Sequence, residues 1–216
     1  MRHTRSILAF GAVLMLASCA SMNQHPMSFF VTSVNPGKGA DFGGLAGADA
    51  YCKSLASTVG AGGRTWRAYL SSTGEGGGQP VNARDRIGKG PWKNANWVTV
   101  ARNVDELHGS NNLGKLTSLT ERGKQISGRG DDVNLHDVLT GSTRDGRLAT
   151  GAADTTCGNW TRSAEGSAIV GHIDKLGLRD DEESHSWNSS HPTRGCSLDA
   201  LKSTGGGGLL YCFAAD

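Results

Sequence analysis

The chain has 216 residues, of which 32 are glycine, 6% are aromatic and 19% are charged. This length fits one domain with a short appendage, and 37% hydrophobic residues are enough to build a core. The glycines do not recur at every third position and only five residues are proline, which excludes collagen. No apolar run reaches the roughly 18 residues that a membrane-spanning helix needs.

Residues 1–18 are typical of an export signal, with Arg2 and Arg5 ahead of a short apolar run. The run ends in Leu16-Ala17-Ser18-Cys19, which resembles a bacterial lipobox and predicts lipidation of Cys19. An ordinary signal peptide cut close to Cys19 is the alternative. We expect residues 19–27 to be a lipidated tether and residues 28–216 to be the folded domain. The predicted location is the cell envelope, at the outer membrane, because Ala20 is not the aspartate that retains lipoproteins in an inner membrane.

The formal charge of +2 belongs to the signal segment. Without Arg2 and Arg5 the 20 remaining basic side chains equal the 20 acidic ones. Net charge therefore gives no support for a polyanion-binding surface, and we expect no nucleic-acid partner.

Four cysteines remain once Cys19 is set aside, and none of them forms a CxxC pair. In an oxidising compartment they predict two disulfides with three possible connectivities. The cysteines are Cys52, Cys157, Cys196 and Cys212.

The predicted elements are short, and more than half of the chain reads as loop. In chain order we expect a strand at 29–33, a turn at 35–39, a helix at 45–58, a strand at 65–71, an apolar run at 97–101, a helical turn at 105–107 and a terminal core strand at 209–213. This pattern predicts a loop-rich α+β domain. Four tryptophans are expected in its core, namely Trp66, Trp92, Trp97 and Trp160.

Several segments resemble endostatin, the C-terminal fragment of a basement-membrane collagen. The matching residues are 47–52, 64–72, 82–86, 90–92, 137–147, 157–161 and 210–212. The likeness runs over about residues 28–216 and is closer still to bacterial endostatin-like lipoproteins. It implies a C-type-lectin-like fold with small antiparallel sheets, one or two helices and long loops. It also implies the nested disulfides Cys52–Cys212 and Cys157–Cys196.

The loop between Cys157 and Cys196 carries the first candidate site, because the equivalent loop of C-type-lectin-like domains holds ligand and Ca²⁺ contacts. The run Asp180, Asp181, Glu182 and Glu183 offers oxygen ligands for Ca²⁺. Trp187 and Asn188 suit a sugar ring, with His185 and His172 close by in sequence. The alternative is a solvated acidic loop with a buried Trp187, since the sugar-binding motifs of C-type lectins are present only as fragments.

Two further motifs are candidates for a functional site. His172, His185 and His191, with Asp174, contain zinc-ligating groups, but their spacing matches no common framework. The N-terminal histidines of the endostatin zinc site have no counterpart beyond His25. Arg129-Gly130-Asp131 spells an adhesion tripeptide, for which a polar turn is the alternative.

These features together predict a surface-tethered, non-catalytic binding lipoprotein. Its ligand would be a glycan or an extracellular-matrix or host protein, with Ca²⁺ as a possible cofactor. The alternatives are an enzyme on a C-type-lectin-like scaffold and a structural envelope lipoprotein without a soluble ligand.

Overall fold

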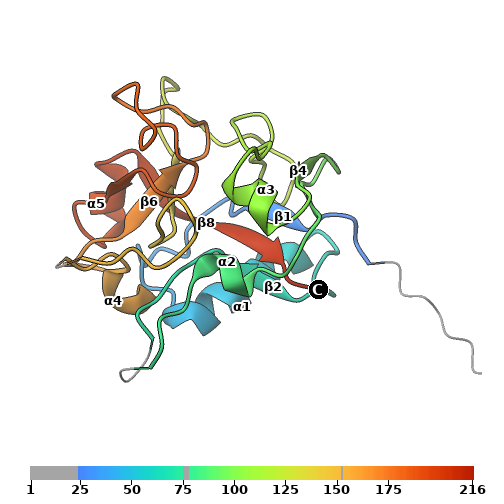
Figure 1. Cartoon of the computed structure of the whole chain (residues 1–216), viewed down its shortest axis with the longest axis horizontal. Coiled ribbons are helices and arrows are strands. Elements are labelled where there is room, and N and C mark those ends of the chain that lie inside the picture. Colours follow the sequence, from blue (N-terminus) through green and yellow to red (C-terminus); the bar gives the residue numbers. More distant parts are fainter. Residues whose placement is uncertain (1–23, 75–77, 152) are drawn as a thin grey trace, which may run out of the picture.

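The computed structural model describes residues 24–74, 78–151 and 153–216 (Figure 1). The signal segment and Cys19 lie outside these residues. The helices are α1 (Gly44–Ser57), α2 (Ala83–Arg86), α3 (Val104–His108), α4 (Cys157–Trp160) and α5 (Leu198–Lys202). The strands are β1 (Phe29–Val31), β2 (Trp66–Ala68), β3 (Trp92–Lys93), β4 (Thr99–Ala101), β5 (Asp137–Leu139), β6 (Ile169–His172), β7 (His191–Pro192) and β8 (Gly206–Ala214). Within the described residues, no helix has the length and apolar character required to cross a membrane.

The longest strand, β8, organises the main sheet and lies in the middle of the molecule (Figure 1). All nine of its residues are buried. β1 and β2 pair with it antiparallel, and β5 pairs with it in parallel. β6 and β7 extend the sheet from β5, and β3 with β4 forms a separate hairpin. The expected mixed α+β architecture with small sheets is confirmed.

The parallel pairing of β5 with β8 corrects the prediction of antiparallel sheets alone. A parallel pair needs a connection of a dozen or more residues, and the chain between Leu139 and Gly206 is far longer than that. β8 is longer than the strand predicted at 209–213. Its first three residues are glycines outside that predicted range, and a Cβ at Gly206 would lie 3.0 Å from the Cβ of Asp137.

The two disulfides have the nested connectivity that the resemblance implied. Cys52 lies on the buried face of α1 with Ala48 and Ala56, at the four-residue spacing of one helix face. Its bond to Cys212 ties α1 to β8, with Cα atoms 5.7 Å apart. The bond between Cys157 and Cys196, with Cα atoms 5.8 Å apart, closes the long loop that carries β6 and β7. The helix predicted at 45–58 is confirmed to within one residue at each end.

Three of the four tryptophans expected in the core are buried, and one is not. Trp66, Trp92 and Trp160 are at most 2% exposed, whereas Trp97 is 64% exposed. Trp97 lies in the turn between β3 and β4, where its φ of 63° and its N–H bond to Asn94 O direct the residue away from the hairpin core. The strand in this region is therefore limited to Thr99–Ala101.

The residues just before β1 contact the folded domain. Met27 is fully buried within the cluster around α1 and β8, and its N–H bonds to His25 Nδ1. His25 O in turn accepts a hydrogen bond from Arg64. The side chain of Met27, the last residue of the predicted tether, therefore packs with the core, and the boundary at residue 27 stays a prediction.

Candidate metal centre

Three neighbouring strands bring an aspartate and two histidines to one face of the sheet. β5 and β6 are antiparallel, and their register places Asp137 directly opposite His172. β7 pairs with β6 so that His191 lies opposite Val170, which shares a face with His172 because side chains alternate along a strand. Directly paired residues of adjacent strands point to the same side. The three side chains Asp137, His172 and His191 are therefore neighbours although they span 54 positions of the chain.

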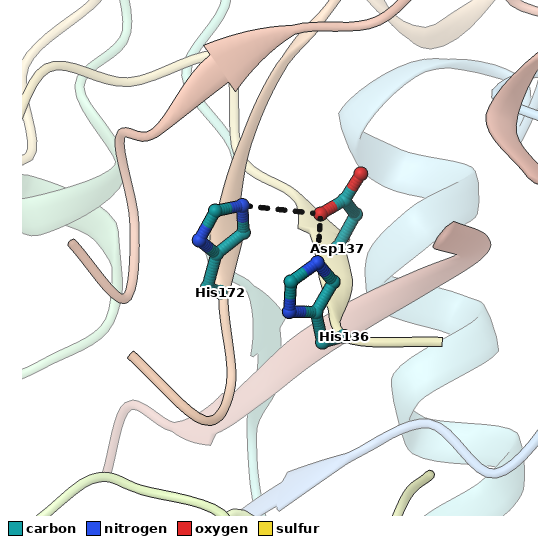
Figure 2. Close-up of side chains that lie close together, drawn as sticks. All are labelled: His136, Asp137 and His172. Atoms are coloured by element: carbon teal, nitrogen blue, oxygen red, sulfur yellow. Dashed lines mark ion pairs between the residues drawn. The ribbon is translucent and has the colours of Figure 1, made fainter. Parts of the chain in front are cut away.

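A third histidine, His136, joins them from the position just before β5. The backbone N–H of His136 donates a hydrogen bond to Asn134 Oδ1 in a turn that leads into the strand. The Nε2 atoms of His136, His172 and His191 lie 3.2, 3.3 and 3.5 Å from a single atom, Asp137 Oδ1. Figure 2 shows the His136 and His172 rings approaching this oxygen. We call His136, Asp137, His172 and His191 the His–Asp cluster.

Each histidine of the cluster uses its other ring nitrogen as a hydrogen-bond donor. His172 Nδ1 lies 2.8 Å from Ser184 O, and His191 Nδ1 lies 3.1 Å from Pro192 O. His136 Nδ1 lies 3.0 Å from Asp174 Oδ1. Carbonyl and carboxylate oxygens only accept, so Nδ1 carries the proton in each ring and the neutral ring presents an Nε2 lone pair to Asp137. This is the arrangement by which proteins orient metal-ligating histidines.

Among the described residues, the Asp137 carboxylate has no hydrogen-bond partner. Both of its carboxylate oxygens and His172 Nε2 are buried polar atoms that make none. The side chains of Asp137, His136 and His172 are 1%, 4% and 4% exposed, and that of His191 is 34% exposed. Burying a carboxylate against nitrogen lone pairs is unfavourable unless a cation or a proton lies between them.

The geometry favours a metal ion over added protons. The rings of His136 and His172 are stacked, with centroids 4.2 Å apart and planes inclined by 6°. Two protonated rings in this position would repel each other across a poorly solvated gap. Ligand atoms about 2.0–2.2 Å from a tetrahedral zinc ion lie about 3.3–3.6 Å from one another, and the three distances from Nε2 atoms to Asp137 Oδ1 are close to this range. The ligand atoms of His136, Asp137 and His172 all lie within 4.8 Å of one another.

The ionisation of the cluster follows from its burial and its contacts. Burial acts to raise the pKa of Asp137, but hydrogen bonds from His172 and His191 and the positive charges of His191 and His136, which these rings provide in their protonated forms, lower that pKa overall. The contact with Asp137 raises the pKa of His191, although partial burial opposes this. Burial likewise acts to raise the pKa of Asp174, and the hydrogen bonds from His136 and from the Arg129 and Leu176 N–H groups lower it overall. Both aspartates are therefore anionic near neutral pH.

The acidic run predicted to bind Ca²⁺ lies in the loop that follows β6, on the opposite side of that loop from the His–Asp cluster. It lines a cavity of about 400 Å³, which we call the acidic cavity and which Asp180, Asp181, Glu182, His185, Trp187 and Asn188 help to form. Asp180 pairs with His185 at 2.8 Å, Asp181 with Arg179 at 2.5 Å, and Glu182 with Arg144. Glu183 is exposed. The carboxylates thus pair with separate cations instead of converging on one point, and Ca²⁺ binding here stays a prediction.

Trp187 and Asn188 line the acidic cavity but do not form the sugar platform that the sequence suggested. Trp187 is 4% exposed and packs between Tyr69 and Tyr211, with ring centroids 4.8 and 5.2 Å away. Asn188 is 1% exposed, and its amide donates to Tyr69 Oη and to the Thr143 and Arg144 carbonyls. The ring face needed for stacking is therefore occupied by the core.

The structure places two of the four residues predicted as zinc ligands in the His–Asp cluster. His172 and His191 lie together as proposed, and Asp174 contacts the cluster through His136. His185 lies elsewhere, between Lys175 O and Asp180. His136 and Asp137 were missed because only the strand pairing brings them to His172. A His–Asp pair at the start of a strand was the one signal present in the sequence.

The adhesion tripeptide lies beside the cluster. The Arg129 N–H bonds to Asp174 Oδ2, and Asp131 is held by Lys115 and by the Gly128 N–H. Asp131 closes a turn with these contacts, as the polar-turn alternative requires. Adhesion through this tripeptide stays a prediction.

Comparison of the sequence with models of protein families and with curated proteins finds no match. The resemblance to endostatin and to the bacterial endostatin-like lipoproteins therefore remains a prediction.

Proposed function

We propose that the chain is a metal-dependent binding domain, anchored to the bacterial envelope through Cys19, with the His–Asp cluster as its metal site. The observation that carries this proposal is the convergence of three Nε2 atoms on the buried, hydrogen-bond-free carboxylate of Asp137. A set of imidazole nitrogens with one carboxylate suits Zn²⁺, whereas Ca²⁺ prefers an all-oxygen set. Zinc is therefore the first ion to test.

Each of the three proposed histidine ligands already has its supporting contact. Asp174 orients His136, and main-chain carbonyls orient His172 and His191. Because outer contacts of this kind fix the ring orientation, the site needs little rearrangement to accept an ion. His191 is the one partly exposed ligand, so an ion can enter from its side.

The remaining parts of the proposal rest on the sequence. Lipidation at Cys19, an outer-membrane location, a C-type-lectin-like fold and a glycan or matrix-protein ligand agree with the export signal and with the resemblance. The two disulfides suit an oxidising compartment and leave Cys52, Cys157, Cys196 and Cys212 without free thiols. A thiol nucleophile is thus not available from these four residues for the enzyme alternative.

Equilibrium dialysis of the disulfide-bonded domain against Zn²⁺ tests the metal site directly. We expect one zinc ion per chain in the wild type and a loss of more than about 100-fold in affinity for His172→Gln. His185→Gln is the matched control, because this histidine pairs with Asp180 outside the cluster, and its zinc affinity should equal that of the wild type.

Because His172 is buried, a second variant tests the site in case the His172→Gln protein fails to fold. His191→Gln changes a partly exposed side chain, and we expect it to fold and to bind zinc at least about 10-fold more weakly. Zinc binding that is equally tight in the wild type and in both cluster variants would show that the ion lies elsewhere and would overturn the proposal.

A further inference from the structure

The His–Asp cluster lies at the wall of a cavity of about 600 Å³, which we call the metal-side cavity. His136, His172 and His191 all contribute to its lining. A volume of this size accommodates a small molecule or the end of a larger one. An ion in the cluster would therefore be accessible to a ligand and not sealed within the protein.

The lining of this cavity is basic. Arg129, Arg194 and Lys202 contribute to it from three separate segments of the chain, and all three are exposed. Among the described residues, none of the three forms an ion pair. The fourth basic residue, Arg179, is neutralised by Asp181. In the part of the chain that the structure describes, the cavity lining contains no aspartate or glutamate.

A bound ion would increase the positive charge at the cavity. The buried carboxylates nearest to it, Asp137 and Asp174, are fewer than the three unpaired basic side chains, so the region is positive even without metal. A divalent ion would add two further positive charges at the inner wall. A cavity lined by charge of one sign concentrates ligands of the opposite sign, and the field is strongest where solvent is limited.

We infer that the metal-side cavity binds a ligand through a carboxylate group, which the metal ion in the His–Asp cluster and the guanidinium groups of Arg129 and Arg194 recognise together. This inference rests on the proposed metal site. Carboxylate oxygens are established zinc ligands, and arginine binds carboxylates through paired, charge-assisted hydrogen bonds. Leu178, which is 89% exposed and also contributes to the lining, would cover an apolar part of the ligand next to the carboxylate.

The carboxylate can come from an acidic sugar or from an acidic peptide, and calorimetric titrations separate the two sources. The probes are glucuronate for the sugar and N-acetyl-aspartate amide for the peptide, with the methyl ester of each as the uncharged control. Each probe is titrated into the zinc-loaded protein and into the protein treated with EDTA. We expect at least one of the acids to bind the loaded form at least about 10-fold more tightly than the metal-free form, and both esters to bind neither form.

Two arginine variants test the basic lining of the metal-side cavity, and a third arginine variant serves as control. Arg129→Gln and Arg194→Gln should each weaken acid binding by about 5- to 10-fold, referred to the zinc-loaded fraction measured for the same variant. Arg162→Gln removes an exposed arginine that pairs with Asp154 away from the cavity, and it should bind the acids as the wild type does.

The outcomes distinguish this inference from the proposed function. A protein that binds one zinc ion but neither acid would overturn the inference and leave the metal site standing. Equal affinity of an acid for the loaded and metal-free forms would also overturn it. A protein that binds no zinc would overturn both.

Discussion

The loop that follows β6 separates two cavities with opposite chemistry. On one side, the carboxylates of the acidic cavity are exposed or partly exposed, and each has a partner: Asp180 pairs with His185, Asp181 with Arg179 and Glu182 with Arg144. On the other side, the Asp137 side chain is 1% exposed and its carboxylate accepts no hydrogen bond from the described residues, although three histidines point at it. The paired carboxylates of the acidic cavity have partners within the protein, whereas the Asp137 carboxylate of the His–Asp cluster has none among the described residues.

The difference shows which kind of acidic residue indicates a cation site. Exposed ion pairs contribute little to stability and are common on surfaces, so a run of acidic residues does not by itself require an ion. A buried carboxylate surrounded by nitrogen lone pairs is costly, and the cost is removed when a cation binds. The comparison therefore predicts that a transition metal affects one side of the loop and leaves the other unchanged.

The largest expected effect is a selective stabilisation by zinc. At a free zinc concentration 100 times the Kd, linkage predicts about 2.7 kcal/mol of added stability, or about 5–10 °C in Tm for a domain of this size. Ca²⁺ at the same concentration should shift the Tm by less than about 1 °C, because the acidic carboxylates do not converge. Thermal melts with each ion and with chelator measure both values.

A matched pair of substitutions assigns the shift to one side of the loop. Asp137→Asn should abolish the zinc shift, and Asp181→Asn should retain it. A Ca²⁺ shift that disappears in Asp181→Asn, with no response to zinc, would instead support the site predicted from the acidic run.

A smaller effect is expected when the support of a ligand is removed. Asp174 does not belong to the proposed ligand set, but its Oδ1 accepts the hydrogen bond from His136 Nδ1. Asp174→Asn should weaken zinc binding by about 10- to 100-fold, as is typical for outer partners of metal ligands. Zinc titration with a competing chelator measures the change. Asp131→Asn, which alters a nearby aspartate that pairs with Lys115, should leave the affinity unchanged, and an equal loss in both variants would contradict the assignment.

The sequence predicted those parts of the fold that depend on local pattern. The apolar spacing of α1, the strand composition of β1 and the even number of cysteines are local signals, and each agrees with the structure. The strand β8 was predicted too short because its buried glycines look like a loop until the neighbouring β5 is known. Trp97 was misplaced because an apolar residue in a tight turn cannot be told from a strand residue by composition.

The candidate site was only partly predictable, for a different reason. His172, His191 and Asp174 lie within one segment of the sequence, between Cys157 and Cys196, and were predicted as zinc ligands. His136 and Asp137 join them through the antiparallel register of β5 with β6, which no local pattern reveals. The acidic run is the most conspicuous pattern in the sequence. The structure instead indicates a cluster that forms where three neighbouring strands meet.

The smallest expected effect is a pH dependence that changes sign when metal binds. In the metal-free protein, the contact with Asp137 raises the pKa of His191, with His172 as the other titratable neighbour. The stabilisation that Asp137 gives to protonated His191 is complete below the ordinary histidine pKa of about 6.5. It is lost as the pH rises through the higher pKa of His191 in the folded protein. We expect a loss of less than about 1 kcal/mol between pH 6 and 8.5, because His191 is partly exposed and therefore screened by solvent.

Zinc requires the neutral imidazoles, so its stabilising effect should instead increase over the same pH range. Urea denaturation with zinc or with EDTA at several pH values measures both trends, and His191→Gln should flatten the metal-free curve. His185 provides the comparison across the loop, since its pKa is also raised, by the Lys175 carbonyl and then by Asp180, yet it faces no metal ligands. Replacing His185 with Gln should therefore leave the zinc-dependent rise intact. If that rise disappeared in His185→Gln and persisted in His191→Gln, the ion would belong to the acidic cavity.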